Sequence, residues 1–141
     1  YNYQFKKIKN LEKKKFFKSK LKKFDLIISI DVLHHIGIEN SHKILNKLSK
    51  YSKYILIKDH FEHGFFSRHL LRFVDFYANY AYGVKIPNRY FTKKLWKSTL
   101  KKTSLIEIYR LDNFQQHDGL FNFILNKKHH FVSLLKINGK K

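Results

Sequence analysis

The sequence FDLIISIDVLHHI, from Phe24 to Ile36, decides the fold of this chain of 141 residues. The nearly continuous apolar run from Phe24 to Ile30 is typical of a β-strand that is buried on both faces of a parallel sheet. Asp31 ends the run, and a short apolar turn then leads into a helix. Ligands of open α/β sheets bind beyond the carboxyl ends of the strands, so we expect a site at this exit.

The segment after this exit predicts a parallel crossover. Asn40 or Ser41 can cap a helix whose apolar residues recur at helical spacing. A second short apolar strand then runs from Tyr54 to Lys58 and ends at Asp59 and His60. A strand–helix–strand unit of this length is expected to pair its strands in parallel, with a right-handed connection.

The second half of the chain predicts an aromatic helix, a capped helix and a closing pair of strands. Phe65 to Tyr82 is an aromatic-rich helix, and Thr92 has the properties of an N-cap for the helix that follows it. The segments from Ser104 to Leu111 and from His129 to Ile137 have no helix between them, which favours an antiparallel pair. We expect the aromatic helix to have an apolar face made of Phe66, Leu70, Phe73, Val74, Tyr77, Tyr80 and Ala81, and a polar face made of Arg68, His69, Arg72, Asp75 and Asn79.

Composition narrows the class of protein. The apolar share of 43% is enough for a packed core, and the absence of Cys excludes disulfides and thiolate metal sites. The formal net charge is +20, but only four of the 30 basic residues are Arg, whereas proteins that read phosphates and bases favour the Arg fork. We therefore interpret the Lys excess as solvated surface and expect no specific nucleic-acid partner. The longest apolar run is broken by Asp25 and Asp31 and falls short of the ~20 residues of a transmembrane helix, so we expect a cytoplasmic protein.

The stretch from Phe24 to His35 resembles the strand-four motif of the class I S-adenosylmethionine-dependent methyltransferases, commonly written F-D, a hydrophobic run, and then D-V-L-H-H. The block that follows resembles a bacterial subgroup of the same family. Its pattern is carried by Ile57, Lys58, Asp59, His60, Asp75, Asn79, Gly83, Val84, Pro87, Thr92, Lys93 and Trp96. The resemblance implies a partial Rossmann-like α/β fold, with a mostly parallel sheet, an antiparallel C-terminal strand and helices on both faces.

The same resemblance implies a division of the chain and a missing part. Residues 1–23 would be a basic N-terminal remnant, either weakly ordered or a displaced strand, and residues 24–141 the C-terminal part of the methyltransferase domain. Family members carry a glycine-rich loop after their first strand, but no two glycines of this chain stand close together. We therefore expect a fragment that is inactive alone. In the complete enzyme, S-adenosylmethionine would donate a methyl group to a small-molecule acceptor, for which a hydrophobic molecule is one candidate.

Three groups of residues are candidates for the site. The resemblance implies cofactor contacts at Asn10, Asp31, Val32 and Leu33. A base for the acceptor is expected among the candidate catalytic residues His34, His35, Asp59 and His60. The candidate polar contacts to the substrate are Asp75, Asn79 and Tyr82.

Other interpretations stay open at this point. Asp31 and the adjacent histidines could have structural roles, and the aromatic helix could be part of the core. Asp59, His60 and His63 could form a metal trio, but such spacing is common by chance and we expect no metal. Two rival functions are a basic non-enzymatic module that binds nucleic acid or an anionic membrane surface through Lys6 to Lys23, and a lipid-surface protein that uses the aromatic helix.

Overall fold

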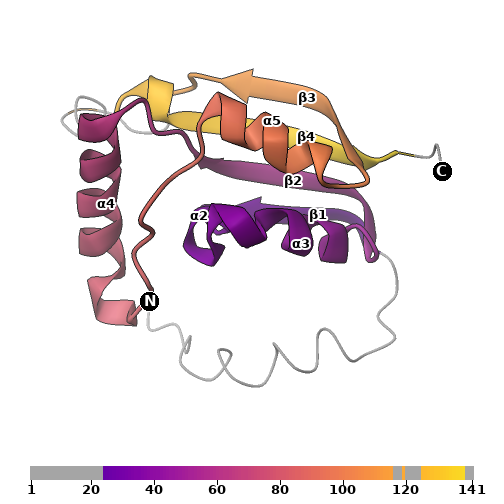
Figure 1. Ribbon diagram of the computed structural model, residues 1–141, viewed down its shortest axis with the longest axis horizontal. Coiled ribbons are helices and arrows are strands. Elements are labelled where there is room, and N and C mark those ends of the chain that lie inside the picture. The colour runs from indigo at the N-terminus through magenta and orange to yellow at the C-terminus, as the bar shows by residue number, and fades with distance from the viewer. Residues whose placement is uncertain (1–23, 116–118, 120–124, 139–141) are drawn as a thin grey trace.

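The computed structural model describes residues 24–115, 119 and 125–138, and the candidate cofactor contact Asn10 lies outside them. Four strands form one open sheet in the order β1-β2-β4-β3 (Figure 1). Their bounds are β1 Phe24–Ile30, β2 Ser52–His60, β3 Leu105–Asp112 and β4 His130–Ile137.

Three of these strands run in one direction. β1 pairs with β2 in parallel, and β4 is antiparallel to both β2 and β3, so only the C-terminal strand is reversed. The parallel pair is the crossover expected from the apolar runs at Phe24–Ile30 and Tyr54–Lys58. The prediction of a partial Rossmann-like sheet with an antiparallel C-terminal strand is confirmed.

The helices of the described chain gather on one face and at one end of the sheet. In Figure 1, α3 and α5 lie over one face, and α4 stands at the carboxyl end of β2. None of the described helices is both long and apolar enough to cross a bilayer. The bounds are α2 Leu33–Ile36, α3 Ile38–Leu48, α4 Phe65–Asn79, α5 Lys93–Lys101, and the 3-10 helices η1 Tyr80–Tyr82 and η2 Lys127–His129.

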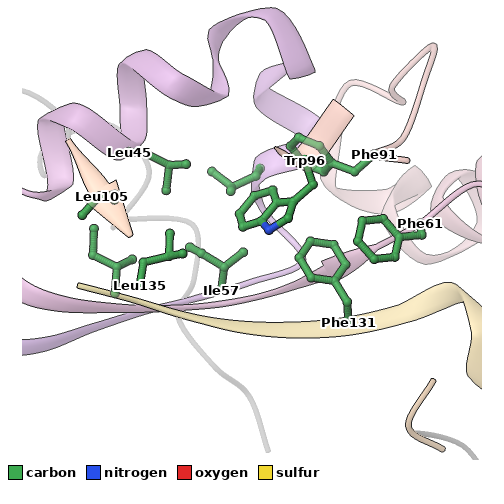
Figure 2. Close-up of a cluster of buried hydrophobic side chains, with 10 residues drawn as sticks. Leu45, Ile57, Phe61, Phe91, Trp96, Leu105, Phe131 and Leu135 are labelled. Carbon is green, nitrogen blue, oxygen red and sulfur yellow. The ribbon is translucent and has the colours of Figure 1, made fainter. Parts of the chain in front are cut away.

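The core fills the space between the sheet and α3 and α5. Figure 2 shows Leu45 from α3 and Trp96 from α5 above side chains of β2 and β4. Phe61 and Phe131 stack with their ring centroids 4.0 Å apart. The indole Nε1 of Trp96 donates to Glu107 Oε1 at 2.9 Å, so its polar atom is satisfied inside the core.

The other face of β1 is exposed. Side chains alternate along a strand, and Ile27 packs against the core while Leu26, Ile28 and Ile30 point to the opposite face and are exposed. The prediction that this strand is buried on both faces is therefore wrong for the described residues, in which α3 and α5 supply a layer on one side only. β1 is also the edge strand of the described sheet.

One helix cap was predicted well and another was not. The hydroxyl of Thr92 accepts from Leu95 N at 3.1 Å and caps α5 as expected. The first predicted cap is wrong, because α3 begins at Ile38 and its N-cap is Gly37, which has a φ of 94°. Ser41 lies within the helix, and its hydroxyl donates to Gly37 O at 2.9 Å.

The predicted faces of α4 are correct only in part: Val74 packs against a buried cluster and His69 is exposed, as expected, but other residues are not where they were predicted. The buried residues of this helix are Leu71 and Asp75, although Asp75 was assigned to the polar face. Phe66, Phe73 and Tyr77 were expected to form the packed apolar face, and they are exposed. The orientation of the helix is fixed by the contacts of Asp75 with His34 and Tyr90. The spacing of residues along a helix does not reveal contacts with distant residues.

Candidate active site

The carboxyl ends of β1 and β2 lie side by side, and each carries an aspartate, Asp31 and Asp59. Ile30 is opposite Lys58 in the register, and Asp31 N donates to Lys58 O at 2.9 Å. Asp31 has a φ of 52°, which lies in the left-handed region. Apart from glycine, this region is adopted mainly by asparagine, aspartate and histidine. The chain therefore turns sharply at Asp31 and passes into α2 beside the end of β2.

Asp31, Lys58 and His60 form an ion-paired group, which we call the edge group. The Nζ atom of Lys58 lies 2.7 and 2.6 Å from the two carboxylate oxygens of Asp31. His60 Nε2 lies 3.2 Å from Asp31 Oδ1. Lys58 and His60 are two positions apart on β2, so they share the face of the sheet that α3 and α5 leave open.

Asp59 points to the other face and is fully buried. One of its carboxylate oxygens, Oδ2, accepts from Leu33 N at 3.1 Å and from His34 N at 3.3 Å. The other, Oδ1, accepts from His60 N at 2.7 Å. Asp59 thus fixes the first turn of α2 to the end of β2.

His34 lies between two buried carboxylates. Its Nδ1 is 2.5 Å from Asp59 Oδ1, and its Nε2 is 3.3 Å from Asp75 Oδ2, within ion-pair distance but off the line of a good hydrogen bond. The Tyr90 hydroxyl donates a short hydrogen bond to the same oxygen of Asp75. We call these four residues, Asp59, His34, Asp75 and Tyr90, the His34 network.

Electrostatics hold His34 in its charged form. Burial lowers the pKa of the imidazole, but the hydrogen bond with Asp59 and the charges of Asp59 and Asp75 outweigh it and raise the pKa from 6.5 to about 10. Burial raises the pKa of Asp75, but the ion pair with His34 and the hydrogen bond from Tyr90 outweigh it, so this pKa falls below 3.8. At neutral pH both ring nitrogens of His34 carry protons, and neither offers the lone pair that a general base needs.

His60 is in the opposite state. Burial lowers its pKa well below 6.5, and the nearby cations Lys58 and His34 lower it further. The neutral ring can donate from Nε2 to Asp31, and among the described residues its Nδ1 has no hydrogen-bond partner. Burial raises the pKa of Asp31 above 3.8, although Lys58 acts against this.

His35 is half-buried and lines a cavity of about 570 Å³. The cavity lies between the α2–α3 segment and a wall made by residues 85–89 and α5. His35 Nδ1 is 3.1 Å from the carbonyl oxygen of Lys85, to which it donates, so Nε2 is the nitrogen left with a lone pair. Both predicted histidines border the cavity, but His34 is fully buried and held in the network, whereas His35 is half-buried.

The remaining predicted residues are spread around this end of the sheet. Val32 is exposed beside Asp31, whereas the Leu33 side chain is buried in the core and cannot face a cofactor there. Asn79 Nδ2 donates to the backbone carbonyl of Asp75 at 2.9 Å, within its own helix. Tyr82 is exposed in η1.

Sequence reasoning missed Glu62 and Tyr90. Glu62 is buried and accepts from Arg68 at 2.8 and 2.7 Å, in the bidentate geometry of strong ion pairs. Tyr90 N also donates to Glu62, at 3.0 Å, so Tyr90 links this pair to the His34 network. Tyr90 is far from its partners in sequence, and no local spacing could have identified it.

A metal ion is not favoured by the donor set. His34, His35 and Asp75 have ligand atoms within 4.8 Å of one another. His34 would have to give up a proton whose pKa is about 10 before it could bind a metal ion. The other candidate trio is not assembled, because His63 Nε2 donates to Lys128 O at 2.7 Å, and Asp59 and His60 point to opposite faces of β2.

No family model matches the sequence, and no curated protein matches it. Solved structures do match the fold. The mitomycin 7-O-methyltransferase MmcR aligns with a TM-score of 0.53 and 16% identity, over 86% of this chain and 32% of that chain. LepI in complex with S-adenosylmethionine aligns with a TM-score of 0.53 and 11% identity, over 84% and 28%.

A third neighbour is an S-adenosylmethionine-dependent methyltransferase from Clostridium acetobutylicum ATCC 824, with a TM-score of 0.50 and 12% identity over 86% of this chain and 61% of that chain. The chain thus spans between 28% and 61% of the length of these structures. At such low identities the likeness establishes the fold alone.

Proposed function

We propose that this chain is the C-terminal portion of a class I methyltransferase domain that transfers a methyl group from S-adenosylmethionine to a small-molecule acceptor. One observation carries the proposal. The sheet order β1-β2-β4-β3, with only β4 reversed, occurs in a chain that aligns with two methyltransferases over 86% of its length. The His34 network and the edge group lie at the carboxyl ends of the strands, where ligands of such sheets bind.

The described residues fit one wall of a cofactor site. Asp31 turns at the end of β1 in a left-handed conformation, and Val32 beside it is exposed. S-adenosylmethionine would supply an activated methyl group for in-line displacement, which depends mainly on alignment. The chain's five glycines do not form a glycine-rich loop, so the opposite wall would come from another stretch of polypeptide and this chain alone would bind the cofactor weakly.

His35 is the best placed base for the acceptor. Its Nδ1 proton is held by the Lys85 carbonyl, its Nε2 keeps a lone pair, and the ring lines the cavity. His60 is neutral, but it is buried within the edge group. Charged His34 and Asp59 instead fix the turn of α2 from which His35 projects.

The test is a chimera that joins the glycine-loop half of the Clostridium methyltransferase to residues 24–141 of this chain. Calorimetry should detect micromolar binding of S-adenosylmethionine by the chimera, and Asp31→Ala should weaken it about tenfold, a loss of one charge-assisted contact. A folded chimera that does not bind S-adenosylmethionine would contradict the proposal. Micromolar binding of S-adenosylmethionine by the 141-residue chain alone would contradict the claim that a second wall is needed.

The role of His35 has its own test in the same chimera. His35→Gln should leave cofactor affinity unchanged and lower transfer of labelled methyl groups to small molecules of a cell extract by about 100-fold, the usual contribution of a general base. His42→Gln is the matched control, since His42 lines the same cavity. The nucleic-acid alternative depends on Lys6 to Lys23, outside the described residues, and no observation favours it.

A further inference from the structure

The exposed face of α4 is made almost entirely of aromatic rings. Phe73, Phe76, Tyr77 and Tyr80 are spaced by three and four positions, and Phe66 lies two turns before Phe73 with exposed His69 between them, so these residues form one stripe along the helix. Tyr80 in η1 continues the stripe beyond the end of α4. We call this set the aromatic face; its members and exposed fractions are Phe65 66%, Phe66 87%, Phe73 67%, Phe76 50%, Tyr77 81% and Tyr80 75%.

The opposite side of α4 is anchored to the body of the protein. Leu71 packs with Tyr90 in a small buried cluster, and Asp75 accepts from the Tyr90 hydroxyl. Arg68 pairs with buried Glu62 through two hydrogen bonds. The helix cannot rotate to bury its aromatic face without breaking these contacts, so the exposure is built into the fold.

The charge around the aromatic face is positive. α4 contains a single acidic residue, Asp75, which is buried and hydrogen-bonded to Tyr90. The exposed side of the helix therefore carries no carboxylate. Arg72 borders the face, one turn before Phe76. The whole chain has a formal net charge of +20, which opposes contact between two copies and favours an anionic surface.

We propose that α4 lies on an anionic lipid bilayer with its aromatic face in the headgroup region. Phe and Tyr rings are favoured at that depth, and basic residues add attraction to anionic lipids. A helix of 15 residues is about 22 Å long, too short to span a bilayer but suited to lie in its surface. This inference does not depend on the proposed methyl transfer.

The test is co-sedimentation of the 141-residue chain with vesicles. Phosphatidylcholine vesicles containing about 30% phosphatidylglycerol should retain the chain at least about tenfold better than pure phosphatidylcholine, because aromatic burial and charge act together. The double variant Phe66→Ser with Tyr77→Ser should lose about tenfold in binding. Tyr109→Ser on β3 is the matched control, since Tyr109 is an exposed aromatic residue away from α4.

A second measurement removes any dependence on the fold of the double variant. In Phe66→Trp, tryptophan emission should shift to the blue with anionic vesicles and should be quenched by brominated lipids, whereas Tyr109→Trp should show neither change. If the double variant binds like the original chain, another segment carries the binding and the proposal fails. It also fails if Phe66→Trp is not quenched, or if ultracentrifugation finds a dimer that the double variant abolishes, because a second copy then covers the face.

Discussion

Nδ1 of His34 lies 2.5 Å from Oδ1 of Asp59, so the second residue of α2 is joined to the end of β2. The same carboxylate accepts from the backbone N–H groups of Leu33 and His34. One buried side chain therefore fixes both the path of the chain after β1 and the charge state of the histidine. Asp75 and Tyr90 complete the arrangement on the other side of the ring.

Asp59→Asn should destabilise the fold strongly. The amide keeps the shape of the side chain but removes the charge that balances His34, and breaking one partner of a buried pair costs about 3 kcal/mol. Urea unfolding would measure the loss. Asp112→Asn is the control, because Asp112 pairs with Arg110 and Lys93 nearer to solvent and should cost about 1 kcal/mol or less. Equal costs in the two variants would show that the network does not hold His34.

The stability that His34 contributes should fade at alkaline pH. Its pKa is about 10 in the folded chain and about 6.5 for an unperturbed histidine, so the contribution is fully present below pH 6.5 and is lost as pH rises through about 10. The difference in unfolding free energy between the original chain and His34→Gln should therefore shrink between these limits. Urea unfolding at several pH values checks this, and a constant difference would rule out a charged His34.

His60 should make the folding stability of the chain depend on pH in the acid range. Its pKa in the folded chain lies well below 6.5. Below pH 6.5 the unfolded chain therefore binds more protons than the folded chain does. The stability that depends on neutral His60 is present above pH 6.5 and is lost as pH falls further. His60→Gln should flatten the acid limb of the stability curve. The same unfolding series, extended to acid pH, measures this, and an acid limb as steep as that of the original chain would contradict the role of His60.

The local sequence pattern was sufficient to predict the strands of the sheet and one helix N-cap. The apolar run Phe24–Ile30 coincides with β1, and Tyr54–Lys58 falls inside β2. Thr92 caps α5 because a hydroxyl just before a helical run can reach the N–H groups of the first turn. These features depend on neighbours in sequence. Gly37 displaced the other expected cap, because the positive φ it adopts there starts α3 before Asn40.

Features that depend on distant residues could not be predicted. Asp75 looks like a surface residue of an amphipathic helix, yet it is buried by its bonds to His34 and Tyr90. The direction of His34 likewise depends on Asp59, on the next strand. The strand-four resemblance directs attention to the carboxyl end of β1, but the roles of the residues there depend on contacts between segments.

Tyr90→Phe should isolate the contribution of the hydroxyl to the network. The substitution keeps the ring but leaves buried Asp75 without its donor, which costs about 1 to 3 kcal/mol. It should also raise the pKa of Asp75, because the hydrogen bond from Tyr90 helps to keep that pKa low. Carboxyl carbon NMR shifts would follow the titration. An unchanged Asp75 titration would mean that His34 alone controls this carboxylate.

The two faces of the sheet should respond differently to the loss of an isoleucine. Ile57 on β2 is 0% exposed, and Ile57→Ala should cost about 2 to 5 kcal/mol through lost burial and a cavity. Ile28 on β1 is 57% exposed on the open face, and Ile28→Ala should cost about 0.5 kcal/mol in the same chain. If Ile28→Ala cost as much as Ile57→Ala in urea unfolding, this face would be covered in solution. In a chimera that supplies the other half of the domain, the cost of Ile28→Ala should rise, because strands and helices of that half would then pack against β1.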